Sequence, residues 1–86
     1  MISKKITIRN QSGLHARPAT LFVKETNKFK SEIRVRKEDK EVNGKSILSI
    51  LTLEAIQGST IEIKADGIDE TEALDALITL LSSDLE

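Results

Sequence analysis

The chain has 86 residues, which is enough for one hydrophobic core, and we expect a single domain over residues 1–86. It has no cysteine, which excludes disulfide bonds and thiolate metal sites. Its 13 basic and 14 acidic residues nearly balance and few residues are aromatic, which argues against a nucleic-acid-binding surface. No stretch approaches the ~20 apolar residues of a membrane span, and the N-terminus lacks the apolar run of a signal peptide. We therefore expect a cytoplasmic protein without membrane contact.

The N-terminal part of the sequence predicts a strand followed by a helix. Residues Lys4–Arg9 alternate between polar and apolar side chains, as in a strand with one buried face. Residues Arg17–Lys28 have the spacing of an amphipathic helix instead. The residues expected on the buried face of this helix are Ala19, Phe22, Val23 and Thr26.

The middle of the chain predicts a β-hairpin and a short helix. Residues Glu32–Lys37 alternate again, and the polar run after them leads into a short strand at Glu41–Asn43. Ser46 is a favourable helix N-cap, and the apolar run that begins there predicts a short helix within residues 46–55. The turn at Gly58 follows this helix.

The C-terminal part predicts a last strand and a last helix. Residues Thr60–Ala65 carry apolar side chains at alternate positions, which is typical of a strand. Asp69 and Glu72 have the spacing of a capping box, in which each side chain accepts a bond from the other residue's backbone amide. Behind them, four apolar residues recur at helical spacing: Leu74, Leu77, Ile78 and Leu81.

The order of these elements and the strand patterns together indicate the fold class. All four strands alternate rather than running as continuous apolar stretches, which is typical of a sheet with one covered face and one face in solvent. We therefore predict an α/β (α+β) fold of βαββαβα order, a two-layer open-faced sandwich. Its three helices are expected to cover one face of a four-stranded, mainly antiparallel sheet.

The stretch "QSGLHARPAT", residues 11–20, contains the only histidine and the only proline of the chain. Pro18 is suited to a first helical turn, where its missing N–H costs nothing, so His15 is expected at or just before the start of the helix. The backbone amides of Ala16 and Arg17 then lack helical partners, and such amides bind phosphate at helix ends. The Arg17 guanidinium could add a bidentate contact to phosphoryl oxygens.

Several roles for His15 need to be compared. Taken alone, a single histidine is most often a partly exposed residue without chemistry. The sequence offers no second histidine, no cysteine and no carboxylate at ligand spacing, so we expect no metal and no cofactor. It also lacks a nucleophile motif that would complete a Ser-His-Asp triad. The remaining chemical role is an imidazole that itself takes up a group covalently.

The motif "GLHARPA", Gly13–Ala19, resembles the active-site signature of the HPr family, the histidine-containing phosphocarriers of the bacterial phosphoenolpyruvate:sugar phosphotransferase system. The segments "NGKSI", "QG" and "ADGIDETEAL" agree in register, so the resemblance covers the whole chain. It implies that His15 accepts a phosphoryl group on Nδ1 from enzyme I and passes it to IIA domains for sugar uptake. It also implies that Arg17 orients and partly neutralises this group, and that the protein is a carrier rather than an enzyme.

Ser46 is a second candidate site. Its spacing alone explains it as a helix cap. The resemblance adds regulation, because many HPr proteins of Gram-positive bacteria are phosphorylated on the matching serine by a dedicated kinase. HPr kinase/phosphorylase and a catabolite-control repressor therefore join the candidate partners.

The resemblance also implies a docking surface for enzyme I and the IIA domains, formed by the first and second helices. Ile47, Leu48 and Leu51 are expected to be partly exposed, because the second helix has apolar residues on more than one face. The carrier role needs only a monomer. The residues assigned to this surface are Thr20, Lys24, Lys45, Ile47, Leu48, Leu51 and Glu54.

Glu54 departs most clearly from the family, which usually has glycine at this position. If Glu54 lies beside His15, its carboxylate would repel a phosphoryl dianion, and an ion pair with Arg17 would relieve that repulsion. Two other classes of protein remain open alternatives. One is an HPr-like paralogue that acts mainly as a regulatory binding protein, although such paralogues lose the histidine that this chain keeps. The other is a small-ligand binding module in which His15 is incidental.

Overall fold

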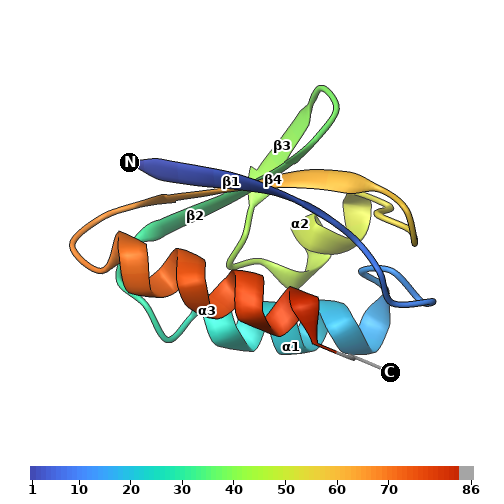
Figure 1. The fold of residues 1–86 in the computed structure, drawn as a ribbon, viewed down its shortest axis with the longest axis horizontal. Coiled ribbons are helices and arrows are strands. Elements are labelled where there is room, and N and C mark those ends of the chain that lie inside the picture. Colours follow the sequence, from blue (N-terminus) through green and yellow to red (C-terminus); the bar gives the residue numbers. More distant parts are fainter. Residues whose placement is uncertain (84–86) are drawn as a thin grey trace.

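The computed structural model describes residues 1–83 and arranges them in the order βαββαβα (Figure 1). Each predicted strand and helix is present, and most differ from the prediction by one or two residues at their ends. The strands are β1 (Ile2–Thr7), β2 (Glu32–Lys37), β3 (Lys40–Asn43) and β4 (Thr60–Asp66). The helices are α1 (Ala16–Thr26), α2 (Ile47–Thr52) and α3 (Glu70–Ser82).

The four strands form one sheet in the order β1-β4-β2-β3, and all neighbours are antiparallel. Figure 1 shows α1 and α3 side by side beneath this sheet, with α2 on the same side near its far end. The predicted two-layer open-faced sandwich is therefore confirmed. Within residues 1–83, no helix is long and apolar enough to cross a membrane.

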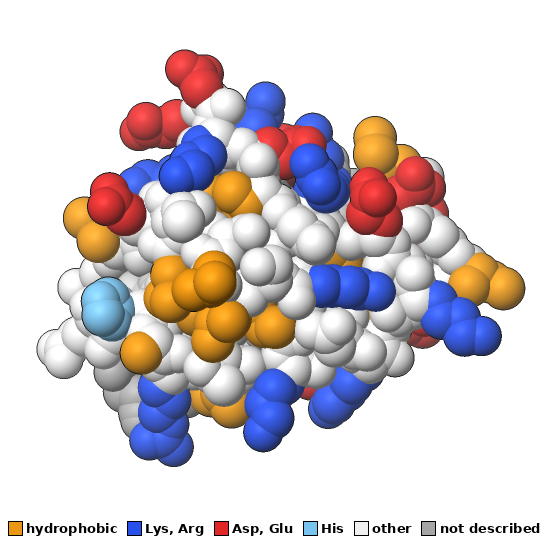
Figure 2. All heavy atoms as spheres, turned by 180° about the vertical axis from the view of Figure 1, so that it is seen from behind, with side chains coloured by type: hydrophobic (Ala, Val, Ile, Leu, Met, Phe, Trp, Pro, Cys, Tyr) orange, Lys and Arg blue, Asp and Glu red, His pale blue; other side chains and the backbone are white. Residues whose placement is uncertain are grey.

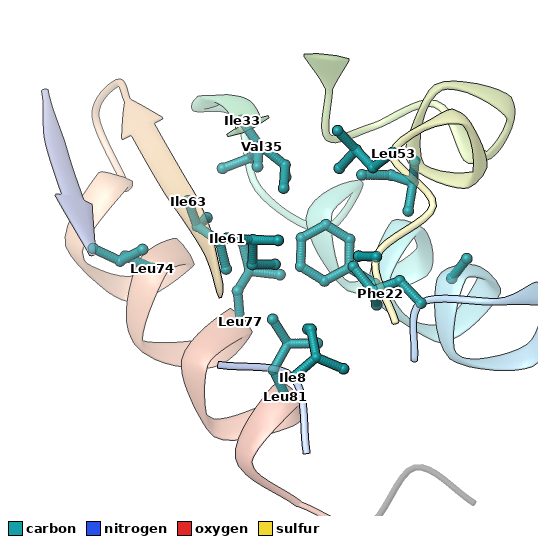
Figure 3. Close-up of a cluster of buried hydrophobic side chains, with 14 of the residues drawn as sticks. Ile8, Phe22, Ile33, Val35, Leu53, Ile61, Ile63, Leu74, Leu77 and Leu81 are labelled. Atoms are coloured by element: carbon teal, nitrogen blue, oxygen red, sulfur yellow. The ribbon is translucent and has the colours of Figure 1, made fainter. Parts of the chain in front are cut away.

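The core lies between the sheet and the helices. Alternate residues of β2 and β4 point into it, and the predicted apolar faces of α1 and α3 meet them there. Figure 3 shows Phe22, Ile61 and Leu77, from three different elements, converging at its centre, and all three are almost completely buried. Other buried members include Ile33, Val35, Ile63, Leu74 and Leu81.

The first strand lies two residues earlier than predicted. β1 pairs with β4 from Ile2 opposite Ala65 to Thr7 opposite Thr60, where β4 begins. Beyond that point Ile8 is bonded to the turn that precedes β4. The Ile8 amide donates a hydrogen bond to the Ser59 carbonyl at 2.8 Å. The predicted continuation to Arg9 was wrong because the partner strand begins only at Thr60, opposite Thr7.

The first helix ends at Thr26, two residues before the predicted end at Lys28. The amide of Lys28 donates to the carbonyl of Glu25, a tighter turn than that of an α-helix. The Thr26 hydroxyl group bonds to the carbonyl of Gly44 at 2.9 Å, which ties this end of α1 to the loop before α2. The helix therefore ends in a tighter turn, and its last residue is tied to the loop before α2.

The capping box predicted for α3 is absent, because Asp69 has partners elsewhere. Its side chain makes no bond to its own helix and instead accepts hydrogen bonds from the amides of Lys30 and Ser31, both at 2.9 Å, and from the Ser31 hydroxyl. Glu70, rather than Glu72, reaches back to a backbone amide, that of Gly67. Asp69 thus fastens the α1–β2 loop to the start of α3. These hydrogen bonds to Ser31 and Lys30 lower the pKa of Asp69 to about 2.

The Asp69 contacts predict a pH-dependent contribution to stability. Because the folded protein lowers this pKa from 3.8 to about 2, the stabilisation is complete above about pH 4 and is lost as the pH falls towards 2. We expect Asp69→Asn to lower the melting temperature clearly at pH 7 and only slightly near pH 2. The measurement is thermal unfolding across this pH range.

Asp75→Asn is the matched control, because Asp75 is an exposed residue of the same helix. This control should melt like the parent at pH 7. Equal melting temperatures for Asp69→Asn and the parent at pH 7, or a gap that persists unchanged at pH 2, would contradict the assigned role of Asp69.

Candidate functional site

His15 is the N-cap of α1 and is exposed, as predicted. Its backbone is extended, with φ −91° and ψ −165°, and its carbonyl accepts the first helical bond from the Ala19 amide at 2.8 Å. Its side chain makes no capping bond. Among residues 1–83 no hydrogen bond or ion pair engages the imidazole ring of this exposed residue.

The first turn of α1 supplies backbone donors next to this imidazole. Pro18 is its third residue and is buried, while Ala16 and Arg17 before it are exposed. Helix amides point towards the N-terminus, and the amides of the first turn have no carbonyl one turn earlier within the helix. The hydroxyl of Thr20 donates to the Ala16 carbonyl, so the Thr20 side chain does not accept a hydrogen bond from these amides. An anionic group on the His15 ring could accept bonds from them.

The loop that carries His15 is fastened to the segment after α2. The amide of Leu14 donates to the carbonyl of Ala55 at 2.8 Å, and Leu14 itself is buried. Gly13 has φ +63°, and a Cβ atom there would lie 2.3 Å from the Ala55 oxygen. The Asn10 side chain bonds to the Gly13 carbonyl at 2.6 Å and closes the turn. The sequence analysis missed Asn10 and Ala55, because no local pattern predicts a contact between these distant segments.

A hollow of about 350 Å³ lies between these two segments. His15 and Leu14 line one side, and Leu51, Glu54 and Ile56 line the other. Glu54 and His15 border the same hollow, which is the arrangement under which the carboxylate of Glu54 would repel a phosphoryl group on His15. The proposed ion pair between Glu54 and Arg17 is not formed in the described part of the chain.

The residues predicted for partner docking lie on α1 and α2. Thr20 and Lys24 are exposed on α1. On α2, Leu48 is 74% exposed and Ile47 36%, while Leu51 is half-buried, as predicted. Figure 2 shows hydrophobic side chains gathered beside the single histidine, with basic side chains along the neighbouring edge.

Two residues modify the predicted docking surface. Lys45 is half-buried, and its ammonium group donates a hydrogen bond to the carbonyl of Phe29 at 2.6 Å, so this group is engaged within the protein. Ile56 is 66% exposed at the edge of the hollow, but the sequence analysis did not assign it to the surface. Ile56 lies in the exposed loop between α2 and β4, which the sequence analysis assigned only to a turn.

Ser46 is the N-cap of α2, and its predicted capping role is confirmed. Its hydroxyl accepts a bond from the Ser49 amide at 3.3 Å, and its carbonyl accepts one from the Ile50 amide. The residue is half-buried and directly precedes the exposed pair Ile47 and Leu48. Any group added to the Ser46 hydroxyl would change the edge of the apolar surface on α2.

Comparison with known proteins identifies the family. Residues 2–83 match the family model PTS-HPr, described as the PTS HPr component phosphorylation site. The chain belongs to the HPr family. The protein is therefore related to phosphocarriers of the phosphotransferase system. An HPr protein carries a phosphoryl group and is not itself a catalyst.

The similarity to HPr proteins extends over nearly the whole chain. The HPr-like protein Crh of Halalkalibacterium halodurans is 44% identical, over 98% of this chain and 100% of that protein. The phosphocarrier protein HPr of Neisseria meningitidis is 45% identical, over 95% of this chain and 92% of that protein. The crystal structure of HPr-C-His from Thermoanaerobacter tengcongensis has a TM-score of 0.95 at 48% identity, over 96% of this chain and 93% of that one.

The close contact at Gly13 predicts a specific intolerance to a side chain. Gly13→Ala combines an unfavourable backbone conformation, which costs about 1 kcal/mol, with a steric overlap that costs about 1–3 kcal/mol. We expect a loss of about 2–4 kcal/mol in the free energy of unfolding, measured by denaturant titration. Hydrogen exchange at the Leu14 amide should accelerate in the same variant.

Gly58→Ala provides the control for this substitution. Gly58 also has a positive φ, +92°, but a Cβ atom there meets nothing within 4 Å. We expect only the conformational cost, about 1 kcal/mol. If the two variants lose equal stability, the contact between Gly13 and Ala55 does not hold the loop as described.

Proposed function

We propose that His15 accepts a phosphoryl group from phosphorylated enzyme I and passes it to IIA domains for sugar uptake. The observation that carries this proposal is the exposed, unbonded imidazole of His15 at the N-terminus of α1. Membership of the HPr family supplies the class of chemistry. Because transfer needs only one acceptor ring, we propose that the monomer performs it.

The transfer step follows from the arrangement around His15. A neutral ring nitrogen attacks phosphorus, and by resemblance to the family this nitrogen is Nδ1. At the same time the bond from phosphorus to the donor breaks, and the electron pair of that bond leaves with the donor. The proton on the other ring nitrogen stays in place. The phosphoryl oxygens can then accept hydrogen bonds from the amides of Ala16 and Arg17. Transfer to a IIA domain repeats the same exchange in the opposite direction.

Arg17 is suited to stabilise the transferring group. It is exposed, and within residues 1–83 no ion pair engages its guanidinium. A guanidinium can bind two phosphoryl oxygens at once, and such charge-assisted bonds are stronger than neutral ones. We propose that Arg17 binds the phosphoryl group after transfer and that Pro18 fixes the helix start from which the amides project.

Docking of the partners would use the surface of α1 and α2. The basic residue Lys24 and the exposed apolar residues Ile47 and Leu48 provide charge at the edge and apolar area beside the histidine (Figure 2). Interfaces of this kind combine an apolar centre with a polar rim. We therefore propose that enzyme I and IIA domains present acidic groups around an apolar patch.

The first test of this function is phosphorylation of the parent and of His15→Ala by enzyme I and phosphoenolpyruvate. The parent should gain one acid-labile phosphoryl group in intact mass spectrometry, and the variant should gain none. Because His15 is exposed, its replacement should change the melting temperature by no more than about 4 °C. Phosphorylation of the variant, or an unmodified parent, would exclude His15 as the acceptor.

We propose in addition that phosphorylation of Ser46 regulates docking. The capping position supports this proposal, since a phosphoryl group would add about −1.5 to −2 charges beside Ile47 and Leu48. This charge would repel acidic partners of the carrier. The added phosphoryl group would also offer hydrogen-bond acceptors to proteins that bind the phosphorylated form. HPr kinase/phosphorylase and a catabolite-control repressor are the proposed partners for this state.

Ser46→Asp tests the regulatory role. Aspartate can still cap α2, so we expect a nearly unchanged melting temperature but several-fold slower phosphorylation by enzyme I at low salt. The difference should shrink as salt screens the repulsion. Ser3→Asp, which adds the same charge to an exposed residue of β1, should react like the parent. Equal rates for Ser46→Asp and the parent at low salt would contradict the proposal.

A mainly regulatory role is the second candidate function, because the chain is 44% identical to an HPr-like protein Crh. The retained His15 favours the carrier. The phosphorylation experiment separates the two: a parent that accepts no group on His15, together with modification of Ser46 by the kinase, would identify a regulatory protein.

A further inference from the structure

The C-terminus of α2 is bonded to two lysines of the β2–β3 hairpin. The last carbonyls of a helix lack intrahelical amide partners. Here Lys40 Nζ donates to the carbonyl of Thr52 at 2.9 Å, and Lys37 Nζ donates to those of Leu53 at 3.3 Å and Glu54 at 3.0 Å. Two ammonium groups thus bind three successive carbonyls. Lys37 is half-buried in this position.

The last of these carbonyls belongs to a residue in an unfavourable conformation. Glu54 has φ +52°, in the left-handed region, which residues with a Cβ atom rarely adopt. Glycine, the residue expected here from the family resemblance, adopts this conformation without strain. Residue 54 therefore has a left-handed backbone conformation although its side chain disfavours it. The carbonyl of this same residue accepts the hydrogen bond from Lys37.

This conformation matters for the carrier site because the next residue supports the His15 loop. Ala55 follows Glu54 and is buried. Its carbonyl accepts a hydrogen bond from the Leu14 amide at 2.8 Å. A short path therefore leads from Lys37 through the Glu54 and Ala55 carbonyls to Leu14 and His15. Glu54 also borders the hollow beside His15, so the direction of its backbone sets one wall of the site.

We infer that Lys37 is a positioning residue for the phosphocarrier site. Its ammonium group holds Glu54 in the left-handed conformation and thereby places the Ala55 carbonyl on which the His15 loop rests. This inference rests on the proposed function for its kinetic consequence, but its structural part concerns the Leu14 amide and can be measured without any partner. A lysine that only caps α2 would stabilise the helix without coupling to residue 54.

The experiment compares Lys37→Met, Lys37→Arg and the control Lys5→Met. Lys5 is an exposed lysine of β1, so its replacement removes an equal charge away from α2. Lys37→Met removes both hydrogen bonds of this ammonium group, and loss of the one that bears on residue 54, the charged bond to the Glu54 carbonyl, corresponds to about a tenfold change in an equilibrium or rate constant. We expect Lys37→Met to lower kcat/KM for phosphorylation by enzyme I by this factor, mainly through kcat, since the exposed apolar residues Ile47 and Leu48 of the docking surface are not replaced. Arginine at position 37 should restore the rate, and Lys5→Met should match the parent.

The decisive comparison repeats Lys37→Met in a Glu54→Gly background. Glycine needs no help to adopt the left-handed conformation, so the effect of Lys37→Met should become smaller there. Hydrogen exchange at the Leu14 amide, measured without enzyme I, should follow the same pattern: faster in Lys37→Met, and close to the parent rate in the double variant.

Equal effects of Lys37→Met in both backgrounds, or an unchanged Leu14 amide in Lys37→Met, would overturn the inference. Failure of the proposed function would look different, because the parent itself would then accept no phosphoryl group. In that case the Leu14 exchange rates alone still decide whether Lys37 positions the loop. Circular dichroism of each variant shows whether it remains folded.

Discussion

The hydrogen bond between the Leu14 amide and the Ala55 carbonyl is the contact on which the candidate site depends. It joins the loop before α1 to the segment after α2, and the missing side chain of Gly13 allows the two backbones to approach. His15 follows Leu14 directly, so its backbone is fixed while its ring remains in solvent. The hollow beside His15 exists because these two segments meet.

A phosphocarrier has to satisfy two opposing requirements. Its acceptor must be accessible to several partners, yet the groups that receive the phosphoryl oxygens must already be in place. In this fold the sheet and the helices position the start of α1, whose amides cannot move independently of the helix. The exposed side chains of His15 and Arg17 supply the groups that would meet a partner. Under the proposed function, the fixed backbone provides the hydrogen-bond donors and two surface side chains provide the reactive groups.

Local patterns in the sequence predicted the elements well but not the contacts between them. The periodicity of residues such as Phe22 and Leu77 reports burial directly, so helices, strands and their buried faces were predictable. The capping box failed because the partners of Asp69 lie in the α1–β2 loop, far away in the sequence. For the same reason Ala55 was missed. The position of His15 at the start of α1 was predictable, because a proline suited to the first helical turn follows it closely in the sequence.

The most direct test of this account is nuclear magnetic resonance of the ¹⁵N-labelled protein before and after phosphorylation by enzyme I and phosphoenolpyruvate. The account predicts a phosphoramidate phosphorus signal, a shift of one His15 ring nitrogen, and the largest backbone changes at the amides of Ala16 and Arg17. The Leu14 amide should remain protected from exchange throughout. A phosphoryl group on His15 that leaves the Ala16 and Arg17 amides unchanged, or that releases the Leu14 amide, would contradict it.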